Sequence, residues 1–450
     1  MKTHRKIIVV RYGIILTACL ALPACRESVH AAQFAPEASP LRALAAQAGL
    51  YIGATVQVRD WLDKGRPPGA LWREEGDPEY QRVVAEEFSS ITEENAFKWV
   101  HIHPEPGQFR WEWTDCAVDF AERHGQRVRG HVLIQRETLP WVDALRGREL
   151  LACMEDHITR VVQRYRGRVH QWDVINEILA DAPPARDENL HALTQESLIE
   201  STWKRETGID FIEAAFRAAR RADPDAALFY NDYFHESDLP RAPCDPPCPE
   251  IPNAYDAMLC WKLRRAELLI DHLHARQEGG RPLIDGIGIQ MHLHSVNHYR
   301  HDPACFTRRL RHLAERFSSH GVAVEITEMD VSLMDLFREF CDTPDIRPVA
   351  TPHALALQAR IIHDVLGACL AVPGLSGVTF WGVRDRDSWL GPFYAEGFGA
   401  NPLHRCKNQH VHMPLLFGDN PDTPDTIELL WKKPAYWAVH RVLVERAFAH

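Results

Sequence analysis

Two glutamates, Glu177 and Glu328, each end a short apolar run that reads as a buried strand. The first run is residues 171–177 (QWDVINE), and the second is residues 322–328 (VAVEITE). Hydrolysis of a glycosidic bond needs a protonated carboxyl beside the leaving oxygen and an ionised carboxyl beside the anomeric carbon. Two strand-end glutamates of one barrel would meet that need. A lone strand-end glutamate more often serves in an ion pair, so the neighbouring residues have to decide.

The elements that must position these glutamates alternate between apolar runs and helical patterns, which is typical of βα units around a parallel sheet. Helical spacing is clear over residues 114–124 and 208–220. Eight strands are what a (β/α)8 TIM barrel requires, so we predict this α/β fold. The strands are expected at residues 50–56, 90–92, 128–134, 169–176, 227–231, 286–290, 322–327 and 377–381.

Two segments rich in Pro, Gly, Asn or His, residues 235–252 and 391–414, are expected to be long loops. Both follow strands, so they should emerge on the C-terminal face of the barrel, where active sites are built. A plain surface loop without a role in the site is the alternative for each.

The N-terminus carries basic residues ahead of an apolar run over residues 13–22, with Val29 and Ala31 as small residues before a cleavage point. We predict a signal peptide over residues 1–31, a barrel domain over residues 32–450, and a secreted or periplasmic protein. The run is shorter than the ~20 residues that span a bilayer. Cleavage before Cys25 is the alternative, because residues 22–25 (LPAC) resemble a lipoprotein signal; lipid on Cys25 would anchor the protein in the bacterial envelope.

The composition is that of a soluble globular protein, with 25% charged and 45% hydrophobic residues. Without residues 1–31 the net charge is −15, which argues against nucleic acid or an anionic membrane surface as a partner. We expect a monomer.

Nine cysteines follow Cys25, and this odd number leaves at least one free in an oxidising compartment. Cys244 and Cys248 are expected to close a proline-rich loop by a disulfide. A zinc half-site is the alternative for this pair.

Eight motifs, in order along the chain, resemble the family 10 glycoside hydrolases, whose best-known members are endo-1,4-β-xylanases. One such motif alone would be a weak indication, whereas eight in sequence are strong. The motifs are residues 92–99, 106–111, 129–131 with 139–141, 172–177, 230–233, 286–292, 326–330 and 381–389.

The resemblance implies a retaining double displacement on a xylan-like polysaccharide or oligosaccharide. Glu177 would be the general acid/base and Glu328 the nucleophile, with carboxyls ~5 to 5.5 Å apart. Asn176 would bond the 2-hydroxyl of the sugar, and His292 would hold Glu328. The substrate-binding residues that the motifs imply are Glu94, Asn95, Lys98, His131, Asn176, Gln290, His292, Trp381 and Trp389.

Histidines at positions 292, 294, 298 and 301 invite a zinc interpretation. The two glutamates explain the chemistry without a metal ion, and histidines on a loop are often solvated surface. We therefore expect neither a metal nor a cofactor.

One segment departs from the family pattern: this chain reads Gln135-Arg-Glu-Thr138 where family members usually read Trp-His-Ser-Gln. A guanidinium prefers carboxylate partners, so Arg136 could bind an acidic substituent such as glucuronate. Alternatively, Arg136 pairs with Glu137 or another nearby carboxylate.

Two alternatives to xylan hydrolysis stay open: the same chemistry on a different or acid-substituted β-glycan, and a non-catalytic carbohydrate-binding barrel. The presence of both glutamates with Asn176 and His292 argues against the second.

Overall fold

The computed structural model describes residues 39–58, 69–73, 75–181, 192–234, 254–344, 346–395, 406–418 and 430–448. Pro40–His450 form one compact unit. The predicted signal peptide with Cys25, the predicted loop over residues 235–252 and the pair Cys244 and Cys248 lie outside the described residues. No helix in the described part of the chain is long and apolar enough to cross a bilayer.

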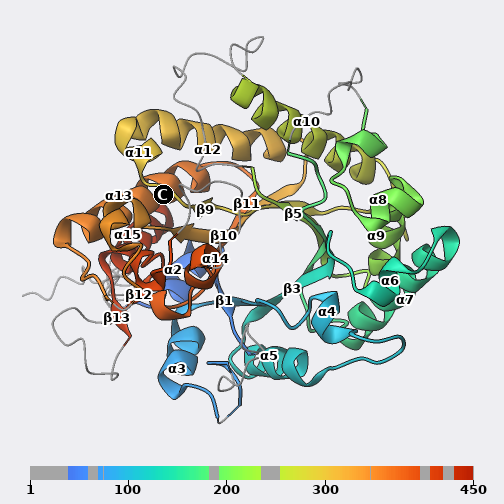
Figure 1. The fold of residues 1–450 in the computed structure, drawn as a ribbon, viewed down its shortest axis with the longest axis horizontal. Helices are drawn as coiled ribbons and strands as arrows, with labels where there is room; N and C mark the ends of the chain where they lie inside the picture. Colours follow the sequence, from blue (N-terminus) through green and yellow to red (C-terminus); the bar gives the residue numbers. More distant parts are fainter. Residues whose placement is uncertain are drawn as a thin grey trace, which may run out of the picture. The chain divides into compact units, whose positions relative to one another are not determined.

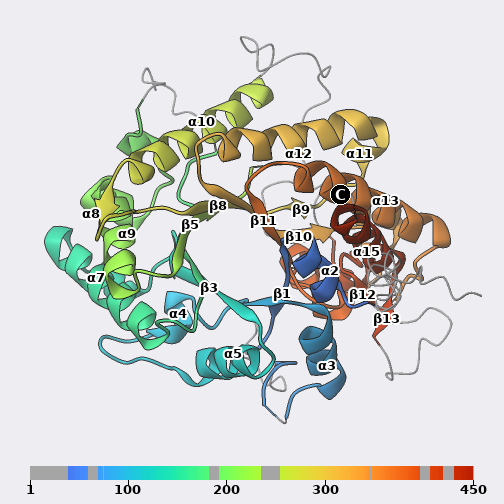
Figure 2. The same cartoon turned by 180° about the vertical axis from the view of Figure 1, so that it is seen from behind.

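Eight parallel strands close a barrel in this unit, as Figure 1 and, from behind, Figure 2 show. Their order is β1-β2-β3-β4-β5-β8-β10-β11, and β11 pairs with β1 to complete the ring. All eight predicted strands are present, and the predicted (β/α)8 barrel is confirmed. The bounds are β1 Tyr51–Val56, β2 Ser90–Glu93, β3 Arg127–Ile134, β4 Gln171–Asn176, β5 Ala227–Asp232, β8 Gly286–Ile289, β10 Ala323–Val331 and β11 Leu375–Phe380.

Helices surround the strands (Figure 1). The two helical patterns seen in the sequence correspond to α5 Glu112–Arg123 and α9 Asp210–Ala222. The others are α2 Leu41–Gln47, α3 Pro78–Glu87, α4 Trp99–Ile102, α6 Pro140–Asp143, α7 Gly147–Arg164, α8 Thr202–Thr207, α10 Ala254–His274, α11 Asn297–His301, α12 Pro303–Ser318, α13 Pro352–Leu370, α14 Leu390–Ala395 and α15 Pro434–Ala447.

Local sequence sets the start of several outer helices. Asp77, Asp302 and Thr351 each accept a hydrogen bond from a backbone N–H in the first turn of α3, α12 and α13. Each is followed by proline, which lacks the N–H that would stay unpaired there. These three helices therefore begin where a side-chain oxygen accepts a hydrogen bond from a backbone N–H of the first turn.

The predicted loop over residues 391–414 is partly wrong. Helix α14, Leu390–Ala395, occupies its beginning, and a 3-10 turn, Gln409–Val411, lies near its end. Residues 396–405 lie outside the described part. Gly391 and Pro392 favour a loop, but proline is tolerated in the first turn of a helix.

A buried ion network fills part of the barrel interior. Arg129, which is 1% exposed, pairs with Asp173 and, at 2.8 Å, with Glu325. Gln171 donates a hydrogen bond to the same Glu325 carboxylate (2.8 Å). Buried charges are tolerated when they are paired and hydrogen-bonded, and this network meets that condition with side chains from β3, β4 and β10.

Candidate active site

Glu177 directly follows β4, and Glu328 lies in the C-terminal half of β10. Their carboxylates are linked by a chain of hydrogen bonds. Gln290 Nε2 donates to Glu177 Oε1 (2.9 Å) and to Asn176 Oδ1 (3.0 Å). Asn231 Nδ2 donates to the same Asn176 oxygen (2.9 Å) and to Glu328 Oε1 (2.7 Å). The structure thus brings both glutamates, Asn176 and Gln290 into one site.

The second oxygen of Glu328 is held by His292, whose Nε2 lies 3.0 Å away. On its other side, His292 Nδ1 lies 2.9 Å from Asp330 Oδ2, which also accepts a hydrogen bond from Trp389 Nε1 (2.9 Å). Burial would lower the pKa of His292, but the carboxylates of Asp330 and Glu328 outweigh it and raise this pKa to about 10. His292 is therefore an imidazolium at neutral pH, with one N–H for each carboxylate.

Glu177 has an unusual backbone conformation. Its φ is +53°, in the left-handed region that residues other than glycine rarely adopt. The backbone N–H of Glu177 donates to the carbonyl of Asn231 (3.1 Å), and its carboxylate accepts from Gln290. Such strain persists where surrounding contacts enforce it, and it is often found at active sites.

Asn231, at the end of β5, is a residue of the site that the sequence analysis did not single out. It is fully buried, and its Oδ1 accepts a hydrogen bond from the Thr327 hydroxyl (2.6 Å). A Cβ atom at Gly288 would lie 2.2 Å from the same oxygen, so the glycine makes room for Asn231. The available signal was a polar residue ending a strand that lies between β4 and β8 in the barrel.

Glu94, Asn95 and Lys98 follow β2 together. Lys98 Nζ donates to Asn95 Oδ1 (3.0 Å), and Gln57 Nε2 donates to Glu94 Oε2 (2.9 Å). Burial raises the pKa of Glu94, and the charge of Glu328 acts in the same direction. Glu94 therefore lies within electrostatic reach of Glu328.

Stacked rings fasten the loop after β2 to α7. The ring of Trp99 stacks on His157 with centroids 3.8 Å apart, and His103 stacks on Phe109 at 4.0 Å. The Nδ1 atoms of His103 and His157 lie 3.2 Å apart. Burial lowers the pKa of His103 to about 4 and that of His157 well below its ordinary value. Both imidazoles are therefore neutral at neutral pH, and one can donate to the other.

Trp381 and Trp389 lie beside His292, and His131 contacts Trp381. The ring of Trp381 lies edge-on to His131 and to His292, with centroids 5.2 and 6.1 Å apart. Trp389 lies 4.8 Å from His292, and His131 Nδ1 lies 2.9 Å from Asp173 Oδ2. Trp381 is 7% exposed, so most of its ring is packed against protein.

The segment after β3 that departs from the family pattern, residues 135–138, has no regular secondary structure and bends at Arg136. Arg136 forms an ion pair with its neighbour Glu137, and their side chains are 42% and 58% exposed. This pairing is the alternative to recognition of an acidic sugar. Trp203 Nε1 donates to the backbone carbonyl of Gln135 (2.9 Å) and holds the segment against α8.

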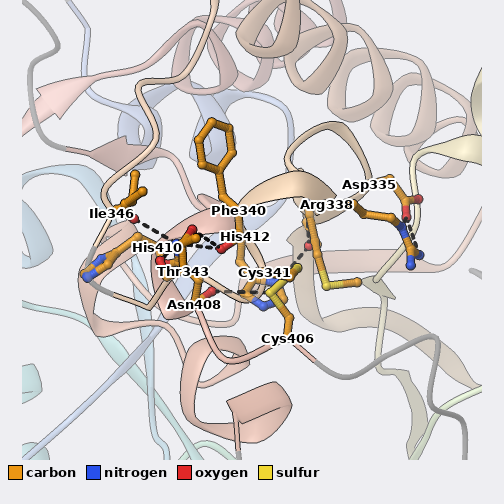
Figure 3. The surroundings of a disulfide bond; sticks show 12 residues. Asp335, Arg338, Phe340, Cys341, Thr343, Ile346, Cys406, Asn408, His410 and His412 are labelled. Carbon is orange, nitrogen blue, oxygen red and sulfur yellow. Dashed lines mark hydrogen bonds and ion pairs between the residues drawn. A yellow bond between two sulfur atoms is a disulfide. The ribbon is translucent and has the colours of Figure 1, made fainter.

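A disulfide between Cys341 and Cys406 joins the segment after β10 to residues 406–418 (Figure 3). Next to it, Asn408 Nδ2 donates to three backbone carbonyls within residues 340–346, at 2.8 to 3.2 Å. His412 Nδ1 lies 2.9 Å from the hydroxyl of Ser332, directly after β10. The disulfide thus fixes a segment that packs against the strand of Glu328.

Two further questions about the described residues concern free thiols and metal-binding groups. Cys116 and Cys153 lie outside any disulfide, which agrees with the odd cysteine count. Within the described ranges, no group of three or more His, Cys, Asp or Glu could hold a metal ion.

Comparisons with known proteins point to one family. A model described as "Glycosyl hydrolase family 10" matches residues 40–441. Endo-1,4-beta-xylanase B of Thermotoga neapolitana is 30% identical over 420 residues, which cover 92% of this chain and 94% of that protein. Native xylanase 10B from Thermotoga maritima has a TM-score of 0.65 at 28% identity, covering 91% of this chain and 100% of that chain. Xylanase 10B from Thermotoga petrophila RKU-1, in complex with xylobiose, has a TM-score of 0.64 at 28% identity, covering 91% and 98%.

Proposed function

Because this chain belongs to glycosyl hydrolase family 10, we propose that it is an endo-1,4-β-xylanase that acts with retention at the anomeric carbon. The observation that carries the proposal is the pair of carboxylates of Glu177 and Glu328 at the C-terminal face of the barrel, each of which accepts a hydrogen bond from a side-chain amide, Gln290 for Glu177 and Asn231 for Glu328. The xylobiose complex of the Thermotoga petrophila enzyme supports a xylo-oligosaccharide as the ligand class.

In the first step, a carboxylate oxygen of Glu328 attacks the anomeric carbon while Glu177 gives its proton to the leaving glycosidic oxygen. Asn231 and His292 donate to the two oxygens of Glu328 and aim the carboxylate. The imidazolium charge of His292 favours the ionised nucleophile. The products of this step are the shortened chain and a glycosyl ester on Glu328.

In the second step, Glu177 takes a proton from water, and the water oxygen attacks the anomeric carbon. Glu328 leaves as a carboxylate, and Glu177 is protonated again. Two inversions give net retention. Gln290, which donates to Glu177 Oε1, keeps the acid/base in place through both steps. The carboxyl separation of ~5 to 5.5 Å stays a prediction of this mechanism.

The sugar is held by polar groups around the pair. The Oδ1 of Asn176 already accepts two hydrogen bonds, so its NH2 is the group it offers to the 2-hydroxyl of the sugar. Glu94, Asn95 and Lys98 would bind further hydroxyls on the non-reducing side. Trp381 and Trp389 would pack on the apolar faces of the sugar rings.

The cellular location belongs to the same proposal. The basic and apolar pattern of residues 1–31 supports export, and xylan is too large to be taken up intact. Lipid on Cys25 is the alternative form, and we expect the protein to act as a monomer.

Hydrolysis of xylan by the wild-type protein, and its loss in Glu328→Ala, tests the function. NMR of the first-formed product should show the β-anomer. A well-folded wild-type protein that binds xylan but releases no sugar would instead support the non-catalytic binding barrel.

A further inference from the structure

A pocket of about 120 Å³ lies beside the segment after β3. Its lining comes from α4, from residues 135–142 and from α8, which follow β2, β3 and β4 in turn. Figure 1 shows these helices on the same side of the barrel as β3. The C-terminal ends of parallel strands meet on one face, so the pocket lies on the face that carries Glu177.

The pocket has an apolar, buried base and an open edge. Trp203 and Val142 are each 1% exposed and Trp99 is 6% exposed, whereas Val100 at the edge is 42% exposed. Sugar hydroxyls would lose their hydrogen-bond partners against such a base. A cavity of about 150 Å³ holds one benzene molecule, so this smaller pocket suits a group of a few heavy atoms.

The pocket coincides with the departure from the family pattern. Gln135 and Thr138 both line it, at positions where family members usually have tryptophan and glutamine. Its walls are fixed before any ligand binds, because Trp203 donates to the Gln135 carbonyl and the Thr138 hydroxyl donates to Asp143 at 2.5 Å. Because these side chains are already held in place, binding of a ligand would cost little of their conformational entropy.

Two residues of the pocket lie close in the sequence to residues that are proposed to bind the substrate. Trp99 directly follows Lys98, and Gln135 lies four residues after His131, which contacts the Trp381 ring beside His292. Lys98 and His131 are among the residues proposed to bind the substrate. The pocket is therefore lined by residues that lie close along the chain to two of the proposed substrate-binding residues.

We propose that this pocket receives a short, uncharged acyl group, such as an O-acetyl ester on a hydroxyl of the xylan chain. The inference rests on the proposed function and deepens it, because it defines the decorated substrate. The methyl group would fill the apolar base, and the ester oxygens would lie toward Gln135 and Thr138, two polar residues of the lining.

An acidic substituent fits less well. Glu137 is one of the lining residues and its carboxylate is the partner of Arg136, so a glucuronate would have to compete with it for the guanidinium. Arg136, the cation that could have attracted it, is already paired with Glu137.

The test compares kcat/KM for O-acetylated xylo-oligosaccharides with the same mixture after mild alkaline deacetylation. We expect the wild-type protein to prefer the acetylated form by about tenfold, the usual gain from burying one small apolar group in a fitted pocket. Val100→Phe inserts a ring at the open edge and should abolish this preference. Val349→Phe adds the same ring at a position that is 66% exposed and does not line the pocket, and it should keep the preference.

Binding to Glu328→Ala protein, measured by calorimetry, tests the pocket without turnover. The acetylated oligosaccharide should bind about tenfold more tightly than the deacetylated one. Equal affinities, a preference that Val100→Phe does not change, or a preference for glucuronate-bearing chains would overturn the inference. Failure of the wild type to hydrolyse any xylan would instead overturn the proposed function, while the binding ratio would still decide the pocket.

Discussion

The catalytic pair and the segment after β3 share one face of the barrel but are held differently. Both oxygens of Glu328 accept hydrogen bonds. One donor is the fully buried Asn231, and the other is His292, which is held in turn by Asp330. Arg136 and Glu137 pair with each other at the exposed surface. Leaving a buried polar group without its partner costs roughly 1–3 kcal/mol, whereas an exposed ion pair contributes roughly 0–1 kcal/mol.

This difference teaches which part of the site can vary. A change in the network around the pair leaves several buried groups unsatisfied at once. A change in residues 135–138 alters the surface that the sugar meets and leaves the hydrogen bonds to the two glutamates in place. The five changes below probe this contrast, in order of decreasing effect on activity.

Removing the nucleophile should have the largest effect. Glu328→Ala should lower kcat/KM on xylan by roughly 10⁵-fold or more, since no other group forms the glycosyl ester. Initial rates of reducing-sugar release measure this. Glu315→Ala, which removes an exposed ion pair with Arg311 on α12, is the control and should keep full activity. A residual rate within tenfold of wild type would contradict the assignment.

The loss of kcat/KM caused by Glu177→Gln should depend on the leaving group of the substrate. On xylan, kcat/KM should fall by roughly 10²- to 10⁴-fold, because the departing alcohol needs a proton. On an aryl β-xyloside with an acidic phenol, kcat/KM should fall far less. The ratio of the two losses is the measurement, and equal losses would rule out Glu177 as the acid.

His292→Gln should lower kcat/KM by roughly 10- to 100-fold, the effect of losing one charged hydrogen bond to the nucleophile. It should also change how stability depends on pH. The folded-state pKa near 10 lies above the ordinary 6.5, so the stabilisation from His292 is fully present below pH 6.5 and is lost as pH rises through about 10.

Urea unfolding of the wild type and of His292→Gln across this range measures the effect. The difference in free energy of unfolding should shrink from pH 6.5 to about 10. A constant difference would show that His292 does not carry the extra proton.

Replacing Cys341 and Cys406 by serine should affect stability more than chemistry. The disulfide closes a loop of 65 residues, and its loss should lower the free energy of unfolding by roughly 2–4 kcal/mol. Activity at moderate temperature should change less than about twofold. Cys153→Ser, at a thiol outside any disulfide, is the control for the substitution itself.

Arg136→Ala should have the smallest effect. Losing an exposed ion pair changes stability by less than about 1 kcal/mol. Plain and glucuronate-bearing xylo-oligosaccharides should be cleaved with unchanged relative rates. A selective loss on the glucuronate-bearing substrate would revive direct recognition of acid by Arg136.

The sequence was sufficient for the barrel because each strand is a short apolar run between helical patterns, and all eight runs form strands. The strand ends also pointed to the two glutamates, since strand-end residues of a barrel converge on one face. Asn176 and His292 came from the resemblance to the family motifs. Asn231 was missed because its importance lies in bridging Asn176 and Glu328, which only the folded arrangement shows.

The disulfide pairing, helix α14 and the pocket could not be predicted from the sequence pattern. The partner of Cys341 is 65 residues away, and nothing local marks Cys406 as that partner. Helix α14 was hidden by Gly391 and Pro392, which have low helix propensity but lie in its first turn. The pocket is lined by three segments that are far apart in the sequence, α4, residues 135–142 and α8. The departure at Gln135 could therefore be seen in the sequence, but the shape of the pocket could not.

The left-handed backbone of Glu177 also bears on how such an enzyme can change over generations. Glycine adopts this positive φ without strain, whereas glutamate adopts it at a cost in conformational energy. Selection for stability alone would therefore favour replacing Glu177 by glycine, which would remove the acid/base. Stability and catalytic activity therefore favour different residues at position 177, and the glutamate found there is the residue that activity requires.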